Sequence, residues 1–536
     1  MINSRMINSR SLSLCAVASA FLCSAVALAQ HAAPAVRIVS PIDESQLVTL
    51  HNTVHPLANA ANDRGAAPDG MQLDRIQLVL QRSPAQETAL RQLIAQIHTP
   101  GSPNYHQWLT PDQFGAQFGP ADQDIATIES WLGSHGFSVS KVNPGKGTLE
   151  FSGSVAQMRE AFHTQIHKYV VNGESHYANA NDPQIPAALA PVIGGFASLN
   201  NFHPKSYLQK LGKASFNPTT HQVTPGWTWG NSSGEYFVLA PGDFAIQYDL
   251  KPLYVANVNG TGQTIAIINE SNINIDLVNQ FRTLFGLPAN PPQVIIDGND
   301  PGVDGINNPD GPNYASVEAY LDVEWSGAVA PYATIDLVIA GDTSLESGLI
   351  LAMERAVYGN IAPVISLSFG ECESDLGSTN SFIETLWEQA AAQGQTAMVS
   401  SGDDGSAGCD DDNSEQFATL GQAVSGFAST PYNVAVGGTD FYYSDYATGG
   451  ASISNYWTTT PTQLPAVSIQ KVIPEQPWND SQYGLDIFNQ YATDQSTSIA
   501  AGSGGASNCA TGTGTSSSGG WRPAPPATPN PPGNRS

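Results

Sequence analysis

The chain has 536 residues, with 20 Lys and Arg against 47 Asp and Glu, so its formal charge is −27. Charged residues make up only 12 % of the chain, about half the usual share, so the acidity reflects few basic residues rather than many acidic ones. This charge repels phosphate and excludes a nucleic-acid-binding protein, and 41 % hydrophobic residues exclude wholesale disorder.

The histidines narrow the possible chemistry further. All 11 precede residue 222, so the remainder of the chain has no imidazole base and no imidazole ligand. Ser-His-Asp and Cys-His catalytic sets and histidine zinc sites are therefore excluded from residue 222 onward.

Residues 1–29 have the pattern of a secretory signal peptide. Arg5 and Arg10 form its positive start, and Ala27-Leu28-Ala29 is a small-residue cleavage site. A membrane anchor is disfavoured because serines interrupt the short apolar run. We expect export, to the extracellular medium or a periplasm.

Export makes the cysteines informative. The mature chain keeps Cys372, Cys409 and Cys509, an odd number for an exported protein. We expect Cys372 and Cys409 to bridge two loops, which leaves Cys509 alone.

Residues 37–203 are predicted to form a compact first domain with both helices and strands. Apolar residues alternate from Ile76 to Leu80 as in a strand, and Ser83-Pro84-Ala85-Gln86 reads as a helix N-cap, N1 proline and capping-box partner. The further elements expected are helices at 122–135 and 154–162, strands at 137–142 and 148–151, and a last strand at 167–171.

Residues 204–242 show no clear period and are predicted to be a linker that contains the processing region. From residue 243 to about 510, short apolar strands alternate with amphipathic helices, which predicts a mostly parallel sheet covered on both faces. The expected strands are 264–268, 294–296, 334–339, 364–367, 396–400 and 433–436, and the clearest helices are 316–330, 344–358 and 380–393. Residues 511–536 are low in complexity and rich in proline.

Two groups of acidic residues in the second domain are candidate catalytic residues. Glu318 and Asp322 share one face of a predicted helix, and the apolar, small residues that follow them indicate burial. Asp403 follows a buried strand, where parallel sheets place ligands. The alternatives are a solvated acidic helix face for the pair and a turn-stabilising aspartate for Asp403.

Other polar stretches are less specific. Asp410–Asp412 could be a weak calcium loop, but the spacing favours a solvated loop. Gly437-Gly438 and Gly502–Gly505 lack the lysine and helix of a phosphate loop. They are explained equally by close backbone approach to a substrate or by a plain turn.

Several motifs occur in a characteristic order. They are Tyr105–Pro111, Phe114–Pro120, Gly260–Ile267, the Glu318/Asp322 helix ending in Gly327-Ala-Val-Ala-Pro331, Ser366–Gly370, Ser401–Asp403 and Thr430–Thr439, followed by Ile473–Glu475, Trp478–Asp480 and Gly502–Ser507. With them the chain resembles the sedolisin (kumamolisin-type) serine-carboxyl peptidases: residues 72–203 resemble their propeptide and 243–440 the start of their catalytic domain. The resemblance implies an α/β, subtilisin-like mostly parallel sheet, preceded by an α+β ferredoxin-like prodomain.

The resemblance also implies roles for the acidic residues. Glu318 resembles the general base that takes the proton of the nucleophilic serine, and Asp322 resembles the residue that orients Glu318. Asp403 resembles the protonated oxyanion-hole acid. A carboxylate base titrates near 4, so this set suits an acidic medium.

The family pattern breaks at the C-terminal end. Gly514-Thr515-Ser516 spells part of the nucleophile motif, but Gly520 stands where its proline belongs, and we interpret Ser516 as an accident of composition. No nucleophile is identified. Calcium is expected for the family, but its C-terminal ligand loop is not found here, so no metal ligand is assigned.

We therefore predict a secreted, acid-acting serine-type endopeptidase zymogen that cleaves protein or peptide substrates and contains its own propeptide. The catalytic domain is expected to be incomplete at its C-terminal end and this chain to be inactive, with a frameshift or truncation as the hypothesis. The alternative is a non-catalytic, secreted peptide-binding protein derived from the same fold, or a product that does not fold stably.

Overall fold

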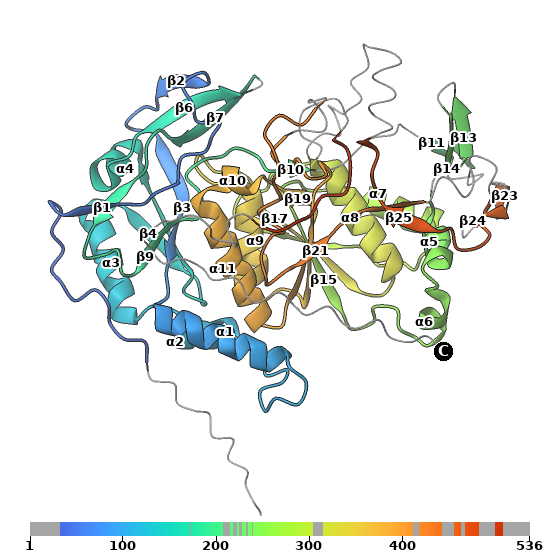
Figure 1. Cartoon of the computed structure of the whole chain (residues 1–536), viewed down its shortest axis with the longest axis horizontal. Coiled ribbons are helices and arrows are strands. Elements are labelled where there is room, and N and C mark those ends of the chain that lie inside the picture. Colours follow the sequence, from blue (N-terminus) through green and yellow to red (C-terminus); the bar gives the residue numbers. More distant parts are fainter. Residues whose placement is uncertain are drawn as a thin grey trace, which may run out of the picture.

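The computed structural model covers two bodies of secondary structure side by side (Figure 1). It describes residues 33–171, 173–206, 215–217, 222–224, 228–231, 234–237, 239–303, 315–410, 417–441, 455–462, 467–481 and 499–507. The predicted signal peptide and the predicted tail at 511–536 lie outside these residues. Within the described residues, no helix has both the length and the apolar character that crossing a membrane requires.

The N-terminal domain is built on a four-stranded antiparallel sheet. Its order is β4 (Ser138–Val142), β5 (Thr148–Ser154), β3 (Gln72–Leu80) and β9 (Ile193–Phe196). With helices α3 (Asp122–Ser134) and α4 (Val155–Phe162) as crossovers, this is the βαββαβ order of the predicted ferredoxin-like fold. Leu78 of the central strand lies opposite Leu149 and Phe196, and all three are buried.

Smaller sheets complete this domain. β2 (Asp63–Ala66), β6 (Ile166–Val171) and β7 (Glu174–Asn179) form one, and β1 (Leu47–Thr49) pairs with β8 (Gln184–Pro186). The prediction that residues 167–171 form the last strand is wrong, because three more strands follow and β9 completes the central sheet.

Local signals account for the helix starts. The capping box predicted at Ser83 and Gln86 opens α1 (Pro84–His98), with Ser83 Oγ accepting from the Gln86 N–H at 3.3 Å. The same device opens α2 (Pro111–Phe118), a helix that was not predicted from the sequence, with Thr110 and Gln113 as its partners.

The second body contains a six-stranded parallel sheet, which confirms the predicted α/β class. Its order is β16 (Gln293–Ile296), β17 (Thr334–Ile339), β15 (Thr264–Asn269), β18 (Val364–Leu367), β20 (Thr396–Ser400) and β21 (Val434–Val436). All five pairings are parallel.

Helices cover both faces of this sheet. Ile267 packs into the core beneath α7 (Ile275–Leu284) and α8 (Ala315–Val329). Its neighbours along the strand, Ala266 and Ile268, pack beneath α9 (Gly348–Tyr358) and α11 (Ser378–Ala392). Helix α9 begins four residues later than predicted because Ser347 is its N-cap.

Short elements fill the remaining described residues. They are α5 (Pro241–Gln247), α6 (Lys251–Val255), α10 (Glu373–Leu376), β19 (Phe369–Gly370), β22 (Thr439–Phe441), β23 (Trp457–Thr462), β24 (Val467–Ile469) and β25 (Glu475–Pro477). The predicted linker is not devoid of structure. β10 (Lys205–Ser206) pairs with β19, and two hairpins join β11 (Ser215–Asn217) to β12 (Gln222–Thr224) and β13 (Thr228–Asn231) to β14 (Gly234–Phe237).

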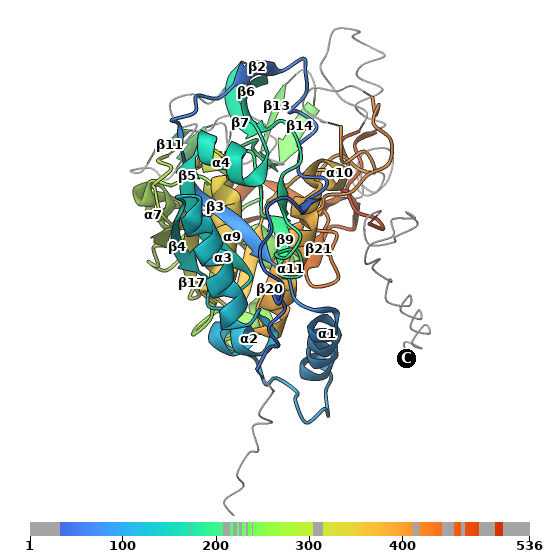
Figure 2. The same ribbon diagram turned by 90° about the vertical axis from the view of Figure 1, so that its left-hand side faces the viewer.

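The N-terminal domain packs against the α9 and α11 face of the parallel sheet (Figure 2). Helix α1 and strand β9 contact α11, and two ion pairs cross the boundary. Arg82 pairs with Glu388 of α11, and Arg75 pairs with Asp297, which follows β16.

Candidate active site

Helix α8 carries Glu318 and Asp322 one turn apart. Glu318 is only 4 % exposed, and small or apolar residues of the same helix, Ala319 and Val323, enter the core beside it. The expected burial of this helix is confirmed, and a solvated acidic face is excluded. Asp322 is partly buried. Taking carboxylates out of water is costly unless they are paired or protonated, which makes Glu318 and Asp322 candidates for function.

Helix α8 is held in place by polar contacts to α7. The hydroxyl of Tyr320, which lies between the two carboxylates in sequence, accepts from the backbone N–H of Asn274, the N-cap of α7, at 2.6 Å. At the other end, Arg282 of α7 donates to the carbonyl oxygen of Gly327 at 3.0 Å. These contacts fix the helix at its middle and its end.

Asp322 is tied to the carboxyl edge of the parallel sheet by Ser368. The Ser368 hydroxyl, directly after β18, donates to Asp322 Oδ1 at 2.8 Å. The other oxygen, Oδ2, is buried and makes no hydrogen bond within the described part of the chain. Burial raises the pKa of Asp322 to about 7, and the Ser368 hydroxyl opposes this rise by stabilising the anion.

We expect Ser368→Ala to raise the pKa of Asp322 by a further unit or so, about 1–2 kcal/mol of lost anion stabilisation. The protonated carboxyl band in infrared difference spectra, assigned by its loss in Asp322→Asn, measures the titration. Ser368→Thr keeps the hydroxyl and serves as the control. An unchanged titration in the alanine variant would show that the hydroxyl does not act on Asp322.

Asp403 lies in the loop after β20, which a neighbouring segment holds through the backbone. Its carbonyl oxygen accepts from the Ala501 N–H at 2.8 Å, and the carbonyl of Gly402 accepts from the Ser503 N–H at 2.8 Å. The Ser401 hydroxyl donates to the Ser503 carbonyl at 2.6 Å. Because β20 is the neighbour of β18, this loop and Ser368 leave the sheet at the same carboxyl edge.

The glycine-rich stretches meet beside this loop. A Cβ on Gly502 would lie 3.4 Å from the backbone nitrogen of Gly438, which is an ordinary van der Waals contact, so this neighbour does not require a glycine at position 502. The contact is within the chain, so the two explanations from the sequence, close approach to a substrate and a plain turn, both stay predictions.

Asp410 has a structural role. It is fully buried, and its carboxylate accepts from the backbone N–H of Thr419 at 2.6 Å and of Leu420 at 3.1 Å. The prediction of a solvated loop is therefore wrong at Asp410, which holds a turn. Asp411 and Asp412 lie outside the described residues.

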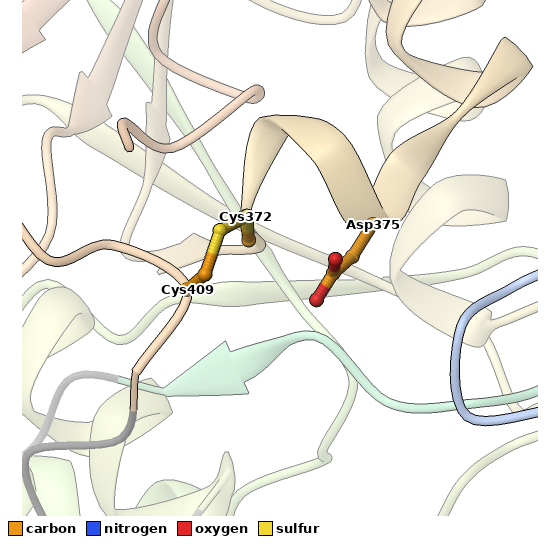
Figure 3. A group of neighbouring side chains, drawn as sticks. All are labelled: Cys372, Asp375 and Cys409. Carbon is orange, nitrogen blue, oxygen red and sulfur yellow. A yellow bond between two sulfur atoms is a disulfide. The ribbon is translucent and has the colours of Figure 1, made fainter. Parts of the chain in front are cut away.

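The predicted disulfide is present. Cys372 and Cys409 are bonded, with Cα atoms 4.8 Å apart, and link the start of α10 to the loop that contains Asp403 (Figure 3). The bond therefore ties the segment after β18 to the segment after β20. Cys509 lies outside the described residues.

The N-terminal domain reaches the same edge of the sheet. β10, where the chain leaves this domain, pairs antiparallel with β19, directly after Ser368. His55 Nε2 lies 2.7 Å from Glu371 Oε1, at the far end of β19. The exit from the first domain thus runs alongside the strand that follows the Asp322 contact.

The described residues do not fit a calcium ion. Two groups of three potential metal ligands occur among them, Cys372, Asp375 and Cys409 in one and His203, Glu270 and Asp342 in the other. The first contains the disulfide and the second an imidazole, whereas calcium takes six to eight oxygen ligands.

Sequence reasoning missed Ser368 as a partner of Asp322. Ser368 directly follows a correctly predicted strand. Because side chains just after the strands of a parallel sheet gather at the carboxyl edge of the sheet, this position marked Ser368 as a candidate. Ser516 and its surroundings lie outside the described residues, and no nucleophile is assigned.

Comparisons with known proteins give a consistent result. The family described as the pro-kumamolisin activation domain matches residues 59–202. The chain is 28 % identical over 378 residues to sedolisin of Pseudomonas sp. (strain 101), covering 69 % of this chain and 60 % of sedolisin. It is 27 % identical over 346 residues to kumamolisin of Bacillus sp. (strain MN-32), covering 63 % and 57 %.

Xanthomonalisin of Xanthomonas sp. (strain T-22) is 26 % identical over 388 residues, covering 68 % of this chain and 46 % of the relative. The matches thus span between 46 and 60 % of the length of these three relatives. A solved structure of Pseudomonas sedolisin, a serine-carboxyl proteinase, aligns with a TM-score of 0.31 at 25 % identity, covering 46 % of this chain and 66 % of that one. Residues 59–202 therefore match the pro-kumamolisin activation domain, and the chain is similar to sedolisin, xanthomonalisin and kumamolisin over 63 to 69 % of its length.

Proposed function

We propose that this chain is the zymogen of a secreted, acid-acting serine-type endopeptidase. The observation that carries the proposal is the pair of buried Glu318 and partly buried Asp322, with Asp322 held by Ser368 at the carboxyl edge of the sheet. The absence of histidine from residue 222 onward leaves carboxylates as the available bases in this domain.

In this proposal each acidic residue has a distinct task. Glu318 accepts the proton of the attacking serine hydroxyl, and Asp322 orients Glu318 and shares its proton across the helix turn. Asp403, in its protonated form, donates a hydrogen bond to the oxyanion of the tetrahedral intermediate. Two carboxylates one helical turn apart disfavour double ionisation, so one of them is readily protonated in acid.

The N-terminal domain is proposed to act as the propeptide that keeps the site closed. Its exit strand, β10, lies along β19, where an extended substrate could pair with the same backbone groups. Cleavage within residues 204–242 would free this strand. Export is supported by the signal-peptide pattern and by the disulfide, which persists in oxidising compartments.

Casein hydrolysis by the purified chain at pH about 4 tests the proposal. Because no nucleophile is identified, this chain itself is expected to show no turnover, and any turnover that it does show is expected to be lost in Glu318→Gln and retained in Glu324→Gln. Glu324 is the matched control because it lies on the same helix, and burial raises its pKa to about 8, so at this pH it is already neutral. Equal turnover in the two variants would contradict the role of Glu318, and turnover by the wild type would contradict the expected inactivity of this chain.

A second candidate is a secreted peptide-binding protein without catalysis, which is favoured because no nucleophile is assigned. In that case the chain binds casein peptides at pH about 4 without cleaving them. If turnover is found, Ser516→Ala tests the nucleophile. Loss of turnover would overturn our interpretation of Ser516, and retention would point to another serine.

A further inference from the structure

We propose that Glu270 and Asp342 form a subsite for a cationic side chain of a peptide, and that His203 of the propeptide fills it in this chain. The inference rests on the proposed peptidase function, because it concerns how a peptide is recognised beside the candidate active site.

The imidazole of His203 sits between the two carboxylates. Its Nδ1 lies 3.6 Å from Glu270 Oε2, and its Nε2 lies 3.4 Å from Asp342 Oδ2. Both distances exceed an ordinary N–H···O hydrogen bond, so the contact is mainly ionic. The side chain of Glu270 is 8 % exposed, that of His203 24 % and that of Asp342 33 %.

The two carboxylates belong to the carboxyl edge of the parallel sheet. Glu270 directly follows β15, and Asp342 lies three residues after the end of β17, the neighbouring strand. They therefore converge on the same edge as Ser368 and the Asp403 loop.

The surroundings favour a cation at this point. Burial alone would lower the pKa of His203, but Glu270 and Asp342 outweigh it and raise the pKa to about 9. Two groups of β7 also face the ring: Glu174 adds to the rise, and the ring of His176 lies 5.8 Å away. Burial lowers the pKa of His176, so the positive charge rests on His203.

The backbone that follows His203 pairs with a strand of the second body, as the backbone of a bound peptide would. Two residues further on, β10 (Lys205–Ser206) pairs antiparallel with β19 (Phe369–Gly370), directly after Ser368. An extended peptide laid along β19 in this way presents a side chain at the place His203 occupies. Backbone pairing supplies affinity and the carboxylate pair supplies selectivity, which is how peptides added to a sheet edge are recognised.

A metal ion explains the same three residues less well. The two ring nitrogens face different carboxylates, whereas an imidazole binds an ion through one nitrogen. The contacts therefore fit an imidazolium between two anions, and the class of ligand is an extended peptide with Lys, Arg or His at this position.

Hydrogen exchange of the full chain, read by mass spectrometry over β10 and β19, tests the charge requirement. At pH 7, His203→Gln is expected to exchange roughly tenfold faster there, and His203→Lys as slowly as the wild type. The wild type should lose this protection as the pH rises through about 9, where His203 becomes neutral, and the lysine variant should keep it. His51→Gln, whose exposed ring pairs with Asp182, is the matched control and should change nothing.

A second arm tests recognition of a separate peptide. Octapeptides of residues 199–206 with Lys or Gln at position 203 are added to the His203→Gln chain, and the lysine peptide is expected to bind at least about fivefold more tightly. In a Glu270→Gln, Asp342→Asn background this preference should disappear. Unchanged exchange in β3 and β15 verifies that each variant is folded.

Equal protection by Gln and Lys at position 203, or equal binding of the two peptides, would overturn the subsite. Both measurements are independent of turnover. Turnover that survives in Glu318→Gln therefore contradicts the proposed function while the subsite result stands, and a failed charge preference overturns the subsite alone.

Discussion

Arg82→Met is expected to lower the free energy of unfolding by about 3–5 kcal/mol at pH 8, because it leaves a buried carboxylate without its counter-charge. The guanidinium is 7 % exposed and pairs with Glu388, which is 3 % exposed, across the boundary between the propeptide and α11. It also donates to Glu87 at 2.7 Å and lies 5.7 Å from the ring centre of Phe114.

The loss of unfolding free energy in Arg82→Met should be smaller in acid. Burial already raises the pKa of Glu388 in spite of the guanidinium, and without Arg82 the pKa rises further. A carboxyl whose pKa is raised in the folded chain favours the folded state at low pH, and this contribution is lost as the pH rises through the folded pKa. The variant should therefore differ less from the wild type at pH 5 than at pH 8.

Urea unfolding at both pH values measures the effect. Arg159→Met is the control, because its surface pair with Asp69 is well exposed and little change is expected. Adding Glu388→Gln to Arg82→Met should recover most of the loss. If Arg82→Met unfolded at the same urea concentration as the wild type, the ion pair between Arg82 and Glu388 would not stabilise the boundary.

The stability contributed by other groups at this boundary also falls as the pH rises. Burial raises the pKa of Glu354 and of Glu384 to about 8, and that of His203 reaches about 9. The contribution of the two glutamates is fully present below pH 4.5 and is lost by about pH 8, and that of His203 is fully present below pH 6.5 and is lost by about pH 9. These three groups therefore hold the N-terminal domain more firmly in acid than at high pH.

The strands and helices were predictable where local physics decides them. The six parallel strands were found because each contains an apolar run, although the edge strand β21 is exposed. Helix α1 was found because its capping box is complete within four residues. Helix α2 was missed although Thr110 and Gln113 form the same box, since its motif was interpreted only through its resemblance. Strand β9 was missed because its partner, β3, lies more than a hundred residues away in the chain.

The candidate site could be predicted only in part for a similar reason. Glu318 and Asp322 are neighbours on one helix, so their spacing reveals the pair. The hydrogen bond from Ser368 to Asp322 and the ion pairs of His203 join residues far apart in the chain. Such contacts depend on the strand order, which periodicity does not specify.

Replacing Cys372 and Cys409 together by serine is expected to lower the free energy of unfolding by about 4 kcal/mol, because a disulfide restricts the conformational entropy of the unfolded chain. The bond joins residues 37 positions apart. The double replacement avoids leaving a reactive thiol. Because Asp403 lies within the closed loop, backbone exchange at residues 401–408 should also increase.

Urea unfolding with and without reductant measures this contribution and supplies its own control. Reductant should destabilise the wild type by the same amount and leave the double-serine variant unchanged. The backbone contact of Glu373 with Val424, at 2.9 Å, remains in the variant and should keep α10 attached. A wild type that is insensitive to reductant, yet more stable than the variant, would show that the cysteines act through packing rather than through the covalent bond.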